Sequence, residues 1–95
     1  DKNKKYIVEI VDYLNEKTGK KFTPTCTDTI RHIGARLNEG RTVEQLKQVI
    51  DTKTAQWKGT EQEKYLRPST LFGGKFEGYL NEKRPHKNPY LGEWP

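Results

Sequence analysis

Three glycines divide the sequence into short segments. Gly19, Gly40 and Gly59 each follow a stretch in which apolar residues recur at the three- and four-residue spacing of a helix face. A glycine directly after such a stretch is typical of a helix C-terminus, where the chain often adopts a left-handed backbone conformation. The positions of these glycines therefore predict several short helices. Helices alone account for the apolar pattern, and no pair of strands is needed.

From this pattern we expect an all-α fold, a small single domain of four to five short helices spanning residues 1–82. A flexible C-terminal tail, residues 83–95, is expected to follow, because this segment holds three prolines and shows no periodicity. The expected helices are residues 4–17, 25–38, 43–58, 61–66 and 74–82, with a turn or a single helical turn at 69–72.

Capping boxes mark three of the expected helix starts. In a capping box a threonine side chain and an acid or amide three residues later satisfy free backbone N–H groups at the helix N-terminus. The pairs that fit are Thr25 with Asp28, Thr42 with Gln45, and Thr60 with Glu63.

Length, charge and cysteine content narrow the class of protein. The 95 residues include 18 Lys or Arg and 13 Asp or Glu, for a net charge of +5, so the expected domain is basic. No run of 18 apolar residues is present, so no membrane partner is expected. A single cysteine cannot form an internal disulfide, which fits a reducing, cytoplasmic location.

Residues that could carry catalysis are poorly placed for it. Cys26 falls on the expected apolar stripe of its helix, with Ile30, Ile33 and Leu37, so we expect it to be a small buried hydrophobe. One cysteine and two histidines do not supply four ligands at a recognised metal spacing, and the carboxylates are scattered. We therefore expect no catalytic residues, no metal and no cofactor, and not an enzyme.

Basic residues interleaved with aromatic residues are the remaining feature. Lysine and arginine contacts to phosphates supply most non-specific nucleic-acid affinity, and aromatic rings stack on unpaired bases. This pattern leaves two interpretations open, a nucleic-acid surface and an ordinary basic surface. The candidate residues are Lys17, Lys20, Lys21, Arg36, Lys53, Trp57, Lys64, Tyr65, Arg67 and Lys75.

Three of these candidates allow more than one interpretation. Lys53 projects into the apolar arc of its helix, where it could cover Trp57, pair with a buried acid or reach a ligand phosphate. Trp57 could fill the core or stack on a base. Arg67 could cap the carbonyls that end the preceding helix, or it could face a partner.

A long, specific run stands at residues 65–76, Tyr-Leu-Arg-Pro-Ser-Thr-Leu-Phe-Gly-Gly-Lys-Phe. With residues 10–20, 35–40, 49–53 and Trp57, it resembles the conserved C-terminal domain of phage replication-initiation proteins, the replisome organisers of phages and prophages of Gram-positive bacteria. The resemblance covers residues 6–82 and extends to DnaD-like primosome modules.

The resemblance implies a non-catalytic domain in the cytoplasm of a bacterial host, with DNA as a partner. The alternative that it implies is a protein-interaction module that brings the host replicative helicase or its loader to the phage origin. The residues it carries across are Lys53, Trp57, Tyr65, Arg67 and Lys75. The sequence leaves two functions open. One is DNA binding, to single strands or without sequence specificity, and the other is recruitment of a helicase partner.

Overall fold

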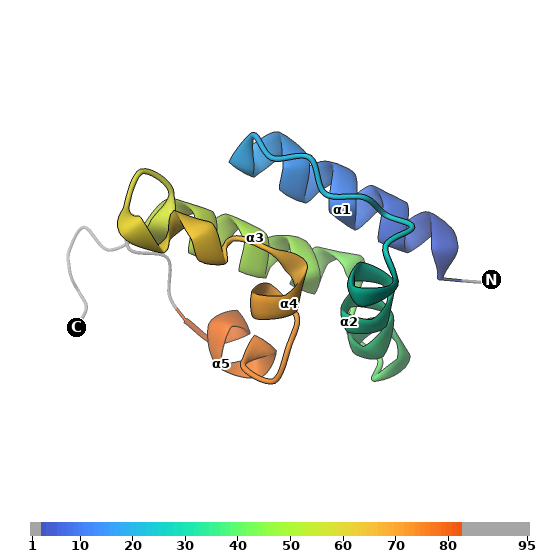
Figure 1. The fold of residues 1–95 in the computed structure, drawn as a ribbon. Coiled ribbons are helices and arrows are strands. Elements are labelled where there is room, and N and C mark those ends of the chain that lie inside the picture. The colour runs from blue at the N-terminus through green and yellow to red at the C-terminus, as the bar shows by residue number, and fades with distance from the viewer. Residues whose placement is uncertain (1–2, 83–95) are drawn as a thin grey trace.

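A computed structural model describes residues 3–82, and this part of the chain contains helices, turns and loops but no strand (Figure 1). The all-α prediction is confirmed. The elements are α1 (Lys4–Thr18), α2 (Thr27–Asn38), α3 (Val43–Trp57), the 3-10 helix η1 (Glu61–Tyr65), α4 (Pro68–Leu71) and α5 (Phe76–Leu80). The expected tail, residues 83–95, lies outside the described residues.

The glycines end the helices as the sequence predicts. Gly19, Gly40 and Gly59 have φ angles of 77°, 98° and 84°, in the left-handed region where a side chain is strained. The capping box of Thr42 and Gln45 is complete, with both reciprocal hydrogen bonds present. These local signals fix the limits of α1 and α3 to within one residue of the expected bounds.

The expected start of α2 is wrong. The helix begins at Thr27, Cys26 is its N-cap, and the side chain of Thr25 makes no capping bond there. Cys26 is exposed rather than buried. Backbone hydrogen bonds from Thr29, and then from Asp28, lower the pKa of its thiol.

The buried face of α2 is also rotated from the expected stripe. Thr29 and Ile33 are 5% and 0% exposed, whereas Ile30 is 38% exposed. This rotation follows from the partner of α2, because the helix packs chiefly against the short α4 and less against α1.

The next expected cap takes a different form. The hydroxyl of Thr60 accepts from the N–H of Gln62, and the carboxylate of Glu63 accepts from the N–H of Gly59. The segment is a 3-10 helix of five residues instead of an α-helix. The chain then turns at Arg67, which is extended (φ −152°, ψ 158°), as expected for a residue before proline.

Two long helices carry the core. α1 and α3 lie side by side and run in the same direction, and the loop of residues 19–26 returns the chain along α1 to the start of α2 (Figure 1). The direction is evident in contacts that advance together along both helices: Lys47 Nζ to Glu9 Oε2 at 2.8 Å, and farther along Lys58 Nζ to the carbonyl of Lys17 at 3.1 Å. The core residues are Ile7, Ile10, Val11, Leu14, Ile33, Leu46, Val49, Ile50, Leu66, Leu71, Phe72 and Phe76.

The turn between α4 and α5 holds the last helix onto this core. Phe72 and Phe76 are buried on either side of the turn, with ring centroids 6.1 Å apart. A Cβ on Gly73 would lie 2.6 Å from the carbonyl oxygen of Ser69, so the backbone at this point is too close for a side chain. α5 is shorter than expected, but it sits where it can form one wall of a surface pocket.

Candidate nucleic-acid interface

A pocket of about 510 Å³ opens between the end of α3, η1, α4 and α5. Four of the candidate residues lie in its wall, although they are spread over 19 positions of the sequence. These four are Trp57, Tyr65, Arg67 and Lys75, and the remaining lining residues are Gln62, Ser69, Thr70, Gly74 and Tyr79. We call this the aromatic pocket.

Trp57 contacts both of the other aromatic rings that line the pocket. Tyr65 and Tyr79 both meet it edge-to-face, with centroid distances of 6.1 and 5.9 Å. Edge-to-face pairs are a favourable geometry for aromatic rings. The three rings therefore form one packed group that ties η1 and α5 to the end of α3.

Lys53 lies beneath this group. Its ammonium is 4.5 Å from the Trp57 centroid and 4.4 Å from the Tyr79 centroid, and the residue is only 3% exposed. Lys53 Nζ also donates to Glu82 Oε1 at 3.0 Å and to Gln56 Oε1 at 2.8 Å. Of the interpretations open at the sequence level, Lys53 combines covering Trp57 with pairing to an acid, so its charge is compensated within the domain.

The same contacts shift two pKa values. Burial acts to raise the pKa of the Glu82 carboxyl, but hydrogen bonds from Gln56 and Lys53 and the charge of Lys53 outweigh it, so the net pKa is lowered. Burial, and next the charge of Glu82, raise the pKa of the Tyr79 phenol. At neutral pH Glu82 is thus a carboxylate and Tyr79 keeps its phenolic proton.

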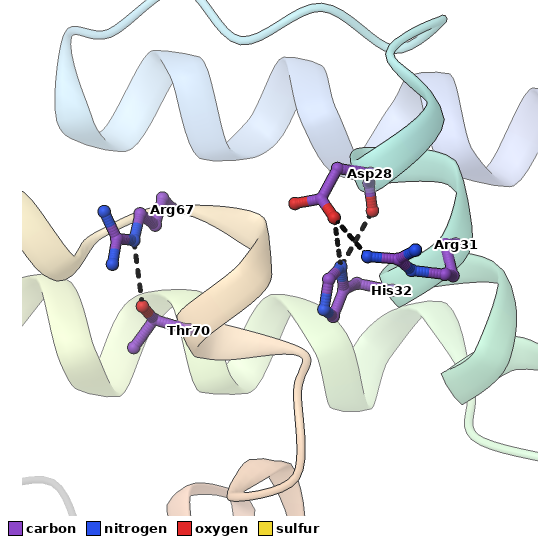
Figure 2. Close-up of polar contacts among 5 residues, drawn as sticks. All are labelled: Asp28, Arg31, His32, Arg67 and Thr70. Carbon is purple, nitrogen blue, oxygen red and sulfur yellow. Dashed lines mark hydrogen bonds and ion pairs between the residues drawn. The ribbon is translucent and has the colours of Figure 1, made fainter.

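Two cations stand at the rim of the pocket. Arg67 is exposed, its Nε donates to Thr70 Oγ1 at 3.1 Å, and its guanidinium lies 5.7 Å from the Tyr65 centroid (Figure 2). Lys75 is exposed as well. Within residues 3–82 neither side chain has a carboxylate within 4 Å, so both present uncompensated positive charge to the pocket.

Two lysines sit close to this rim in different roles. Lys64 is exposed and places its ammonium 5.4 Å from the Tyr65 centroid. Lys20 donates from Nζ to the carbonyls of Glu63 and Leu66, at 2.8 and 3.3 Å. Lys20 thus caps the end of η1, the role that was one of the two alternatives for Arg67.

The other three candidates lie away from the pocket. Lys17 places its ammonium 5.3 Å from the Tyr13 centroid, and Lys21 is exposed in the loop after α1. Arg36 lies on α2, where it donates to the carbonyl of Gly73 at 2.9 Å and pairs with Glu39 at 2.7 Å. Arg36 holds the α4–α5 turn against α2 and is only partly exposed.

Uncompensated positive charge is concentrated at one end of the domain. Within residues 3–82, nine lysines or arginines have no carboxylate within 4 Å. Two of them, Lys4 and Lys5, begin α1. The other seven gather where α1, α3 and η1 end and around the aromatic pocket, and we call them the basic end: Lys17, Lys20, Lys21, Lys58, Lys64, Arg67 and Lys75.

Sequence reasoning missed several lining residues, and Tyr79 above all. Tyr79 shares an apolar helix face with Phe76 and Leu80, so the pattern does not mark it as a nucleic-acid contact. Gln62, Ser69 and Thr70 are common surface residues and carry no signal of their own. The position of Thr70 three residues after Arg67 is the one local clue to their hydrogen bond.

Other kinds of site lack support in the described residues. No three His, Cys, Asp or Glu side chains of residues 3–82 converge as a metal site would require. Over the same residues no helix is long and apolar enough to cross a membrane.

Fold and pocket together define a small helical domain with an aromatic pocket rimmed by free cations. The model of the conserved phage C-terminus family matches residues 10–81, which is about three quarters of the chain, and the protein belongs to this family. The match includes every lining residue of the aromatic pocket. Neither the curated proteins nor the solved structures contain a significant match.

Proposed function

We propose that this domain binds DNA during the initiation of phage replication, through the basic end and without reading a defined sequence. The observation that carries the proposal is the aromatic pocket, in which Arg67 and Lys75 lie beside three aromatic rings and have no carboxylate of residues 3–82 within 4 Å. Cations of this kind contact phosphates, and exposed rings take unpaired bases, so single-stranded DNA is the ligand that fits best. Family membership supports a phage context, and the resemblance to replisome organisers supports the replication role.

The basic end offers a charged surface larger than the pocket itself. Lys58 Nζ reaches the carbonyl of Lys17, and Lys20 Nζ reaches η1, so the ends of α1, α3 and η1 are bound together. A backbone that leaves the pocket rim at Arg67 would meet Lys64 next along the surface. The arrangement suits a flexible strand because it needs no regular groove.

The proposal is tested by fluorescence anisotropy with a labelled oligothymidylate at two salt concentrations. Binding is expected at roughly 50 mM salt and is expected to weaken steeply by roughly 200 mM, since each neutralised phosphate of a single strand contributes about −0.7 to the slope of log K against log salt. Absence of binding at the lower concentration would overturn the proposal. A duplex of equal length is expected to bind more weakly, because its bases are not available to the rings.

A second function is favoured by a different surface. Tyr6 and Ile30 are large apolar residues left 40% and 38% exposed near the first half of α1. Ile30 lines a small pocket with Lys4, Ile7 and Pro24, away from the basic end. An apolar surface of this kind favours a protein partner, and the resemblance names the host replicative helicase or its loader.

The two functions use separate residues, so separate variants distinguish them. Pull-down of purified helicase or loader by the domain is expected to fail with Ile30→Asp and to survive Arg67→Ala. If both variants still pull down the helicase or the loader, the surface around Tyr6 and Ile30 does not bind that partner.

A further inference from the structure

The aromatic pocket differs from a flat stacking platform, and the difference defines what it can hold. The Lys53 ammonium lies over the Trp57 ring, and Tyr65 and Tyr79 each meet this ring in a T-shaped contact. Trp57 is thus used mainly within the domain. The ring that remains most open is Tyr65, which is 38% exposed.

We propose that the aromatic pocket takes in one unpaired nucleobase against Tyr65 and Tyr79, while the adjoining phosphates remain at the rim on Arg67 and Lys75. This inference rests on the proposed function and makes it more specific. It assigns the stacking role to the two tyrosines rather than to Trp57, and it adds Tyr79, which was not among the candidate residues.

The size and lining of the pocket fit one base. Sites for small molecules are commonly about 300–1,000 Å³, and the pocket, at about 510 Å³, falls in this range. Its wall combines ring surfaces with the hydroxyls of Ser69 and Thr70 and the amide of Gln62. A base needs both kinds of contact, since its faces are apolar and its edges carry hydrogen-bond groups.

The hydroxyls of Tyr65 and Tyr79 are also available to form hydrogen bonds with a base. Among the described residues neither the Tyr65 nor the Tyr79 hydroxyl has a hydrogen-bond partner, although Tyr79 is partly buried. Burial raises the pKa of Tyr79, so its phenol keeps the proton that it could donate to a base edge. The Tyr79 hydroxyl is not among the buried unpaired polar atoms, so it is accessible to the edge of a bound base.

Charge favours a nucleotide over an apolar peptide side chain as the occupant. Arg67 and Lys75 at the rim lack acidic partners within residues 3–82. Phosphates on either side of an inserted base would meet these charges, whereas a buried aromatic residue of a protein partner would leave them without a counter-charge. The fixed cation beneath the rings, Lys53, is already paired with Glu82 and does not compete for a phosphate.

The experiment compares two strands of equal length and charge, oligothymidylate and the same backbone with abasic sugars. Both are titrated into the full chain carrying Trp94→Phe, so that Trp57 alone reports by fluorescence. If a base enters the pocket, the thymidylate strand binds about 5- to 100-fold more tightly than the abasic strand, and only the thymidylate strand changes Trp57 emission.

Tyr65→Ala is expected to bring thymidylate binding down to the abasic level while leaving abasic binding unchanged. Tyr65→Phe keeps the ring and is expected to retain the difference. The matched control is Tyr6→Ala, because Tyr6 is 40% exposed and likewise has a lysine ammonium, from Lys5, 5.8 Å from its ring centroid, yet lies outside the pocket. This control is expected to bind both strands as the parent chain does.

The outcomes separate this inference from the proposed function. Equal binding of the two strands, with Tyr65→Ala without effect, would overturn base insertion and leave DNA binding through phosphates intact. If neither strand binds at low salt, both proposals fall, and the aromatic lining is then a surface for a protein side chain. Circular dichroism of Tyr65→Ala shows whether the helices are retained. If they are lost, the two strands are compared on the Tyr65→Phe chain, which keeps the ring.

Discussion

The two ends of this domain carry arginines of the same kind in opposite surroundings. On α2, Arg31 pairs with Asp28 at 2.6 Å, and at the pocket rim Arg67 has the Thr70 hydroxyl instead of an acid (Figure 2). Both side chains are exposed, so the difference lies in the neighbours and not in burial. A cation already paired with a carboxylate has less attraction left for a polyanion, so the place of uncompensated charge matters more than the total of +5.

The largest effect on stability is expected where a charge is buried beneath the pocket. Lys53→Ala removes an ammonium that contacts two rings and pairs with Glu82, and we expect it to lower the free energy of unfolding by about 2–3 kcal/mol, since Glu82 keeps some solvent contact. Urea denaturation followed by circular dichroism measures the change.

Lys47→Ala is the matched control for that change. Lys47 lies on the same helix and also combines an acid, Glu9, with a ring, Tyr13, but its side chain is 30% exposed. Its loss is expected to cost about 0.5 kcal/mol, as for other surface pairs. If the two substitutions lower the free energy of unfolding equally, the contacts of Lys53 beneath the aromatic pocket stabilise the fold no more than a surface pair does.

The next effect tests how closely the turn between α4 and α5 is held against α4. Gly73→Ala places a Cβ 2.6 Å from the Ser69 carbonyl oxygen, which is backbone and cannot easily move, so we expect a loss of about 1–2 kcal/mol in the free energy of unfolding. Thermal denaturation provides the measurement. Gly74→Ala, where the added carbon meets open space, is expected to change stability by less than about 0.5 kcal/mol. A neutral Gly73→Ala would mean that this turn is not held closely.

A smaller effect is expected from the titration of Glu82. Its pKa is lower in the folded chain than in the unfolded one, so folding favours the carboxylate, and the stability it contributes is present above the ordinary glutamate pKa of about 4.3. This contribution is lost as the pH falls from there through the lowered pKa.

Comparison of the chain with Glu82→Gln isolates this group from the other acids. The difference in unfolding free energy is expected to be about 0.5–1 kcal/mol at pH 7 and to shrink as the pH falls below the ordinary glutamate pKa, measured by urea denaturation at each pH. A difference that stays constant over this range would contradict the role assigned to the Glu82 carboxylate.

Much of the fold was predictable from sequence because its signals are local. The glycines at 19, 40 and 59 and the Thr42 capping box act within one or two turns of chain, and they set the limits of α1 and α3. The buried face of α2 was not predictable in the same way. Cys26 and Ile30 fit a helical stripe with Ile33, but the position of α4 decides which side of α2 is covered.

The features of the candidate site also divide into those that the sequence predicted and those that it did not. Trp57, Tyr65, Arg67 and Lys75 were named from sequence, and the fold brings all four to one pocket. The separation of Lys53 from Arg67 and Lys75 was not predictable, because it depends on Glu82 folding back along α3 to pair with the lysine. An ion pair between residues that are 29 positions apart cannot be recognised from local sequence patterns.

The central claim is that free cations at the pocket rim bind DNA while paired cations do not. The most direct test compares single-stranded DNA affinity of Arg67→Ala/Lys75→Ala with that of Arg31→Ala/Lys47→Ala, since both double variants remove two positive charges. We expect the first pair to weaken binding about tenfold or more and to flatten its salt dependence, and the second pair to bind within about twofold of the parent chain. Equal losses from the two pairs would contradict the claim, because net charge alone would then account for the affinity.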